Sequence, residues 1–98
     1  MNITITERAH IALEHLPPPE KKRAMRFLAQ LEGFPNSEVL RGEIYKAPSI
    51  DGKTIFIGKL GLAYRLLFRQ VDQEIVIFEI VHHDRLKRFL GWNDGGLR

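Results

Sequence analysis

Residues 63–89 constrain the fold of this chain more than any other stretch, because they read as two apolar strands followed by a short basic segment. Alternating side chains predict a strand over Tyr64–Arg69, and a more apolar run predicts a second strand over Glu74–His82. Residues 71–73 connect the two strands. We therefore expect a hairpin here, and we expect any chemistry to lie on it or on the basic segment after it.

The remaining segments predict helices first and strands afterwards. Thr6 can cap a first helix, which the three prolines at positions 17–19 end. The other predicted elements are a strand over 2–5, a second helix from about residue 19 to Gly33, strands over 39–46 and 54–60, and a short helix over 84–90. This order predicts an α+β fold, in which an N-terminal strand and a helical hairpin pack on one face of a small antiparallel sheet of about four strands, with a short C-terminal helix.

The composition predicts a single domain over residues 1–98, in the cytoplasm. Ninety-eight residues with 44% hydrophobic content suit one small core. No run reaches the roughly 18 consecutive apolar residues that a membrane-spanning helix needs. The absence of cysteine excludes disulfides and thiolate metal sites. The glycine-rich end at residues 93–98 is predicted to be a flexible tail.

Positive charge is concentrated in the middle of the chain. The formal net charge of +3 does not by itself identify a nucleic-acid-binding protein. Between residues 34 and 70, however, basic residues outnumber acidic residues. The second predicted helix also carries a basic shoulder made of Lys21, Lys22, Arg23 and Arg26. This shoulder is either a solvated helix face or a surface for RNA or an acidic partner.

The connection between the two C-terminal strands decides which way Arg65 points, because a one-residue change of register turns every side chain to the other face. A two-residue loop places Arg65 opposite Ile80, on the most apolar stripe of the chain, whereas a three-residue loop pairs it with Glu79. Burying an unpaired guanidinium is costly, so we predict the three-residue loop. Arg65, Arg69, Glu79 and His83 then share an exposed face.

That face also has simpler interpretations. Arg65 opposite Glu79 can be a cross-strand ion pair and nothing more, contributing about 0.2–1 kcal/mol. His82 and His83 at a strand end can be capping or surface residues. A metal site is not expected, because adjacent residues of a strand point to opposite faces and no further His or Cys lies nearby in the sequence.

Three segments resemble the RelE/ParE superfamily of bacterial toxins from type II toxin-antitoxin modules. Leu40-Arg41-Gly42, after the helical hairpin, is similar to the family's Leu-Arg/Lys-Gly segment. Tyr64–Phe68 is similar to its Tyr-Arg-aliphatic-aliphatic-aromatic strand, and residues 80–88 resemble its apolar strand with a His/Arg-rich end. The resemblance spans nearly the whole chain in size and element order.

The resemblance implies a RelE-like mRNA endoribonuclease that acts on the ribosome, needs no cofactor and is bound by a cognate antitoxin. In such chemistry a base activates the ribose 2′-OH, cationic groups stabilise the charge on the phosphate, and an acid protonates the departing 5′ oxygen. The implied catalytic residues are Arg65, His83, Arg85 and Lys59. The implied substrate-binding residues are Arg41, Arg69, His82, Lys87, Arg88 and Phe89, with Glu79 in support.

The chain departs from the family pattern at three points, one of which is a loop from Ile44 to Thr54 that is longer than in the compact RelE form. Phe56 and Gly58 stand where some RelE proteins carry a Lys-x-Lys pair, and Lys59 can substitute only if a bulge or register shift turns it inward. Phe89 lacks the hydroxyl of the family's C-terminal tyrosine, although it can still stack on a base. Two alternatives are therefore kept, a ParE-like inhibitor of DNA gyrase and a RelE-fold binding protein without catalysis.

Overall fold

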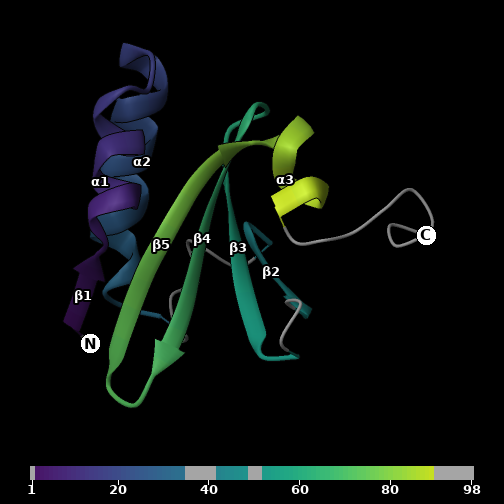
Figure 1. Ribbon diagram of the computed structural model, residues 1–98. Coiled ribbons are helices and arrows are strands. Elements are labelled where there is room, and N and C mark those ends of the chain that lie inside the picture. The colour runs from purple at the N-terminus through teal and green to yellow at the C-terminus, as the bar shows by residue number, and fades with distance from the viewer. Residues whose placement is uncertain (1, 35–41, 49–51, 90–98) are drawn as a thin grey trace.

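The structure is a computed structural model that describes residues 2–34, 42–48 and 52–89. Its elements are β1 (Asn2–Ile5), α1 (Glu7–Glu14), α2 (Pro18–Leu31), β2 (Ile44–Pro48), β3 (Thr54–Leu60), β4 (Tyr64–Val71), β5 (Glu74–His82) and α3 (His83–Phe89). The strands form one sheet in the order β1-β5-β4-β3-β2. α1 and α2 lie together on one side of the sheet, and α3 lies on the other (Figure 1). The predicted α+β class is confirmed.

The helical hairpin begins and turns where the sequence predicts. Thr6 Oγ1 accepts a hydrogen bond from Ala9 N at 3.2 Å, which satisfies one of the free amides at the start of α1. α1 ends at Glu14, and α2 begins at Pro18, whose missing N–H costs nothing in the first turn of a helix. None of the described helices combines the length and the apolar character that crossing a membrane requires.

The end of α2 differs from the prediction. The helix stops at Leu31, and Gly33 is not among the described glycines that have a positive φ angle. The predicted end at Gly33 is therefore two residues too late, and Gly33 does not adopt the left-handed conformation of a helix-terminating glycine. Met25, in the middle of this helix, is 52% exposed.

The N-terminal strand belongs to the sheet itself. β1 pairs in parallel with the first half of β5, from Asn2 opposite Glu74 to Ile5 opposite Ile77. The other pairs of neighbouring strands are antiparallel. The sheet is therefore mixed and has five strands, where a purely antiparallel sheet of about four was predicted.

The β4–β5 hairpin turns through two residues. Val71 pairs with Glu74, so that only Asp72 and Gln73 lie in the turn. Asp72 has a φ of 56°, in the left-handed region that Asp tolerates better than most residues. The predicted three-residue loop is wrong.

A β-bulge in β5 then moves Arg65 away from the apolar stripe. Phe78 has no partner on β4, and this extra residue shifts the register by one beyond it. Arg65 consequently pairs with Val81, and neither with Ile80, as the two-residue loop alone would require, nor with Glu79. Because of the bulge, the protein avoids the free-energy cost of burying an unpaired Arg65 guanidinium. A three-residue loop was predicted to have this effect.

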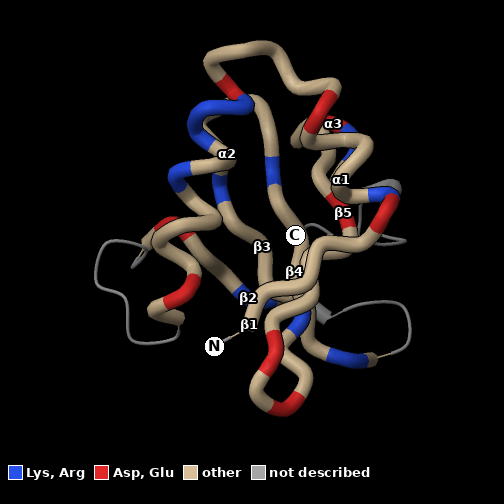
Figure 2. The backbone as a smooth tube through the Cα atoms, turned by 90° about the vertical axis from the view of Figure 1, so that its left-hand side faces the viewer, with Lys and Arg blue, Asp and Glu red and all other residues tan. Residues whose placement is uncertain are grey.

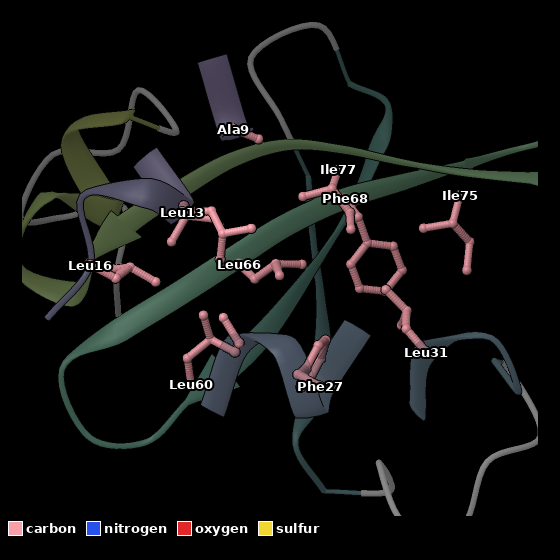
Figure 3. Packing of buried hydrophobic residues seen from close by; sticks show 12 residues of the cluster. Ala9, Leu13, Leu16, Phe27, Leu31, Leu60, Leu66, Phe68, Ile75 and Ile77 are labelled. Carbon is pink, nitrogen blue, oxygen red and sulfur yellow. The ribbon is translucent and has the colours of Figure 1, made fainter. Parts of the chain in front are cut away.

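The main core lies between the sheet and the pair α1 and α2. Phe68 is fully buried and packs against Phe34 and Phe56, with ring centroids 5.3 and 5.2 Å away. Figure 3 shows Phe68 reaching from β4 toward Leu31 of α2. The other fully or nearly fully buried members include Leu13, Ala24, Phe27, Leu60, Leu66, Ile75, Ile77 and Ile80. The bulge turns Phe78 away from Leu66, Phe68 and Ile80, so that it packs against the second cluster described next.

A second, smaller cluster lies on the other face of the sheet. Ile55, Ile57 and Leu67 of the sheet pack there with Ala47 and with Leu86 of α3. Leu86 is 8% exposed, so it anchors α3 to this face. We call this face of the sheet the α3 face. The side chains at the end of the sheet where α3 begins form the candidate site.

Gly58 allows α2 to approach β3 closely. A Cβ atom at this position would meet Cζ of the Phe27 ring and lie 2.9 Å from its Cε1. Because Phe27 is buried, the ring has little room to move aside. We expect Gly58→Ala to lower the free energy of unfolding by about 1–3 kcal/mol, measured by urea denaturation. In a Phe27→Leu background the same change should cost clearly less. Equal costs in the two backgrounds would contradict the overlap.

Candidate functional site

Three strands bring Lys59, Arg65 and Val81 into one row across the sheet. Arg65 is the pairing partner of both Lys59 on β3 and Val81 on β5. Paired residues project on the same face, which here is the α3 face. Lys59 is exposed and Arg65 is half-buried. Lys59 therefore reaches the face of Arg65 by ordinary alternation along β3.

The Arg65 guanidinium is held by one of its nitrogens. Nη1 donates to the carbonyl oxygens of Tyr64 at 2.7 Å, Gly61 at 3.3 Å and Leu62 at 3.5 Å. Within the described part of the chain, Nε and Nη2 have no hydrogen-bond partner. Arg65 thus presents the Nε–Nη2 edge, which matches two oxygens of a phosphate or carboxylate.

Glu79 does not pair with Arg65. Its side chain is 5% exposed, and Oε2 lies 2.6 Å from Nε of Arg8 on α1. This contact is a charge pair without the angle of a hydrogen bond, whereas Oε1 accepts a bond from Ile80 N at 3.1 Å. The predicted Arg65–Glu79 pair and the exposed position of Glu79 are wrong, because the bulge at Phe78 changes the partner of Arg65. Glu79 instead ties β5 to α1.

His82 and His83 lie side by side, because β5 ends at the first and α3 begins at the second. Their ring centroids are 4.7 Å apart and the rings are nearly parallel, at 28°. His83 N donates to Ala63 O at 2.7 Å, which fixes the start of α3 beside β4. The expectation that adjacent histidines point to opposite faces is therefore wrong.

Asp84 contacts both imidazoles and is absent from the residues predicted from the sequence. Its N–H donates to His82 Nδ1 at 3.2 Å, so that nitrogen carries a lone pair in this arrangement. Its Oδ1 lies 3.3 Å from His83 Nδ1, where it can hold the Nδ1–H tautomer and leave Nε2 as a base. The only sequence signal for this role is its place directly after the histidine pair.

The same three residues could hold a metal ion. Among the described residues, one ligand atom from each of His82, His83 and Asp84 lies within 4.8 Å of the others. Two imidazoles and a carboxylate are donors that zinc and related divalent ions accept.

The predicted catalytic residues surround one end of the sheet, and they are divided between two hollows and the surface outside them in the part of the chain that the structure describes. A cleft of about 580 Å³ between α1, the end of β5 and α3 is lined by His82 and Arg85. A hollow of about 200 Å³ beside α2 is lined by Lys59. Arg65 and His83 line neither of them.

The other predicted residues lie apart from this row or outside the description. Arg69 is four residues further along β4, about 13 Å from Arg65 at the usual rise of a strand, and its guanidinium lies 5.3 Å from the centroid of the Phe78 ring. Arg41 falls outside the described residues. Positions 87–89 belong to α3, but the side chains of Lys87, Arg88 and Phe89 lie outside the description.

Tyr45 is an aromatic residue on the same face that the sequence pattern did not indicate. It lies on β2 opposite Ile57, and it is 38% exposed. Lys59 Nζ lies 6.0 Å from the centroid of its ring. An exposed ring beside a cation can stack on a nucleic-acid base.

The comparisons with known proteins agree on a fold. No family model and no curated protein sequence matches the chain. The RelE–RelB complex from Pyrococcus horikoshii OT3 matches with a TM-score of 0.67 and 23% identity, over 86% of this chain and 96% of that chain. The YoeB dimer from Staphylococcus aureus matches with a TM-score of 0.63 and 18% identity, over 85% and 97%. The YoeB/ParE toxin from Agrobacterium tumefaciens matches with a TM-score of 0.62 and 11% identity, over 85% and 99%.

Proposed function

We propose that this chain, which has the fold of the RelE/ParE-superfamily toxins, is the toxin of a type II toxin-antitoxin module and cleaves mRNA on the ribosome. The observation that carries the proposal is the guanidinium of Arg65. It is anchored through Nη1, its Nε–Nη2 edge is unoccupied by the described residues, and Lys59 stands beside it in the same row. Two cations on one face can bind a phosphate whose charge increases during cleavage.

The proposed reaction is attack of a ribose 2′ oxygen on the adjacent phosphorus. His83 Nε2 takes the proton of the 2′-OH, with Asp84 holding the opposite nitrogen of the ring. The new bond joins the 2′ oxygen to phosphorus and the bond to the 5′ oxygen breaks, leaving a 2′,3′-cyclic phosphate and a 5′-OH. Arg65 and Lys59 stabilise the charge on the phosphate oxygens. His82 is the proposed donor to the departing 5′ oxygen in its imidazolium form, in which Nδ1–H faces Asp84 Oδ2 at 3.5 Å and Nε2–H is the proton that is given up, leaving a neutral imidazole.

We also propose a cognate antitoxin as the partner of this chain in the cytoplasm. The RelE protein of Pyrococcus horikoshii was solved in complex with RelB. The exposed cations at the end of the sheet offer a partner of opposite charge a favourable surface.

The test of this function starts from expression of the chain in growing cells. We expect growth arrest, and we expect primer extension to find new 5′ ends in a translated mRNA but none in the same mRNA with its start codon removed. Inhibition of DNA supercoiling in vitro without RNA cuts would replace this function by that of a gyrase inhibitor. Normal growth with neither effect would leave a binding protein.

The role of His83 gives a more specific prediction. His83→Gln keeps a polar side chain but removes the base, so we expect cleavage of translated mRNA to slow by about 10²-fold, the lower end of general acid-base effects. His10→Gln is the matched control, because His10 is an exposed histidine on α1 outside both hollows. A His83→Gln protein that cleaves as fast as the control contradicts the role.

A further inference from the structure

The surface of α2 is hollowed beside its basic residues. One hollow of about 380 Å³ is lined by Pro19, Lys22, Arg23 and Arg26. The 200 Å³ hollow that contains Lys59 is also lined by Arg23 and Arg26. The two hollows share Arg23 and Arg26 in their linings, and we call the surface that they form along the helix the α2 groove and define it by Lys22, Arg23 and Arg26. Figure 2 shows Lys and Arg segments along α2 and on the strands beside it.

The cations of the α2 groove have no partner of opposite charge among the residues that the structure describes. Lys22, Arg23 and Arg26 form no ion pair with any described residue. Glu43 is the one acidic residue that lines either hollow within the described chain. Neighbouring cations repel one another, and a bound polyanion removes that repulsion.

Lys21, on the same helix, differs from these cations because it has an acidic partner. Its Nζ lies 3.0 Å from Glu14 Oε2. This hydrogen bond and the positive charge of Lys21 hold the pKa of the Glu14 carboxyl below its usual range. Lys21 is thus already paired with an acidic residue of α1, whereas the three cations after it on α2 have no such partner in the described part of the chain.

Gly61 places the groove next to the candidate site. It has a φ of 75°, and a Cβ there would lie 2.8 Å from Arg23 Nη1, so glycine makes room for this guanidinium at the β3–β4 turn. Gly61 O also accepts a hydrogen bond from Arg65. Lys59 lines the groove and pairs with Arg65 across the sheet. Arg23 of the groove and Arg65 of the row that carries the proposed chemistry therefore both lie against Gly61.

We propose that the α2 groove binds the sugar-phosphate backbone of the RNA at nucleotides beyond the bond that Arg65 contacts. This proposal rests on the proposed function for the position of that bond. The chemistry of the groove favours a nucleic-acid backbone over an acidic peptide, because its apolar lining residues Phe27 and Leu60 are buried and Pro19 is the only larger apolar side chain that its described lining exposes to an anchoring side chain. Three cations at positions i, i+1 and i+4 of α2 instead present charge along one helix face.

The experiment measures binding without cleavage. A fluorescent single-stranded RNA with 2′-O-methyl groups has no 2′-OH to attack, so its anisotropy reports affinity alone. We titrate the wild type, Arg23→Gln/Arg26→Gln and Lys21→Gln over a series of salt concentrations. Each phosphate contact on a single strand makes the negative slope of log K against log salt steeper by about 0.7. The double variant removes two cations, so its slope should be shallower than that of the wild type by about 1.4. Lys21→Gln removes one charge from the same helix and should keep the wild-type slope.

If the double variant keeps the wild-type slope of log K against log salt, the proposal that the α2 groove binds the RNA backbone is wrong. The proposal is also wrong if Lys21→Gln loses as much of the slope as the double variant, because only the net charge would then matter. If the double variant keeps its RNA affinity but loses affinity for a polyglutamate peptide, the occupant is an acidic protein. Arg26→Gln alone, with an expected loss of about 0.7, replaces the double variant should that protein fail to fold. A wild type that shows these slopes but never cuts translated mRNA overturns the proposed function and leaves the groove intact.

Discussion

Replacing Arg65 by alanine is expected to slow the cleavage of translated mRNA by about 10²–10³-fold, the usual effect of removing one preorganised charged donor from a transition state. The Nη1 bonds to Gly61, Leu62 and Tyr64 fix the guanidinium before substrate arrives, so the wild type loses little entropy on binding the phosphate. Alanine removes both the charge and the Nε–Nη2 edge. Primer extension at matched protein concentrations measures the rate.

Two variants separate the chemistry of Arg65 from charge in general. Arg65→Lys keeps the charge but not the two-pronged edge, and we expect it to recover only part of the activity. Lys46→Gln removes a cation from the opposite face, where Lys46 Nζ lies 6.0 Å from the Phe56 ring, and we expect it to cleave like the wild type. Cuts that persist at wild-type rate in a folded Arg65→Ala protein rule out this role.

Replacing Phe68 by alanine is expected to lower the free energy of unfolding by about 3–5 kcal/mol. Phe68 is fully buried, stacks on Phe56 and meets Phe34 edge to face, so alanine leaves a cavity between the sheet and α2. A domain of this size has only about 5–15 kcal/mol of stability, so the variant should be partly unfolded at 37 °C. Urea denaturation followed by circular dichroism measures the change.

Leu62→Ala is the control for Phe68, because Leu62 is 92% exposed in the β3–β4 turn. We expect its unfolding free energy to stay within about 0.5 kcal/mol of the wild type. A comparable loss in both variants would mean that the ring cluster does not dominate the core.

Local sequence signals predicted the helices and most strands well. The Thr6 cap, the prolines between α1 and α2 and the alternation in β3 and β4 act over a few residues, so they can be recognised without tertiary structure. The parallel pairing of β1 with β5 depends on contacts between distant residues and has no such signal. The bulge at Phe78 could not be predicted either, because a run of apolar residues on β5 does not indicate which residue lacks a pairing partner on β4.

The sequence predicted which residues form the candidate site better than it predicted how these residues are arranged. The resemblance indicated Arg65, Lys59 and His83, and the pairing of strands places Lys59 and Arg65 in one row. The partner of Glu79 could not be predicted, because Arg8 lies on α1, about 70 residues away in the sequence, and the two side chains meet only in the folded chain. The stacking of His82 on His83 follows from a helix that begins at once after a strand, a boundary that periodicity locates only to within a few residues.

The parallel edge strand β1 also sets the order in which this protein can assemble. Ile3 pairs with Ile75, so docking β1 closes a loop of about 70 residues, whereas the β4–β5 hairpin closes through a two-residue turn. Pairings of low contact order form sooner than those of high contact order. β1 leaves the ribosome well before β5 and must wait for it, and the edge of β5 that β1 covers stays open until the two strands pair. β1, which is synthesised before β5, therefore joins this edge of the sheet only after β5 is in place.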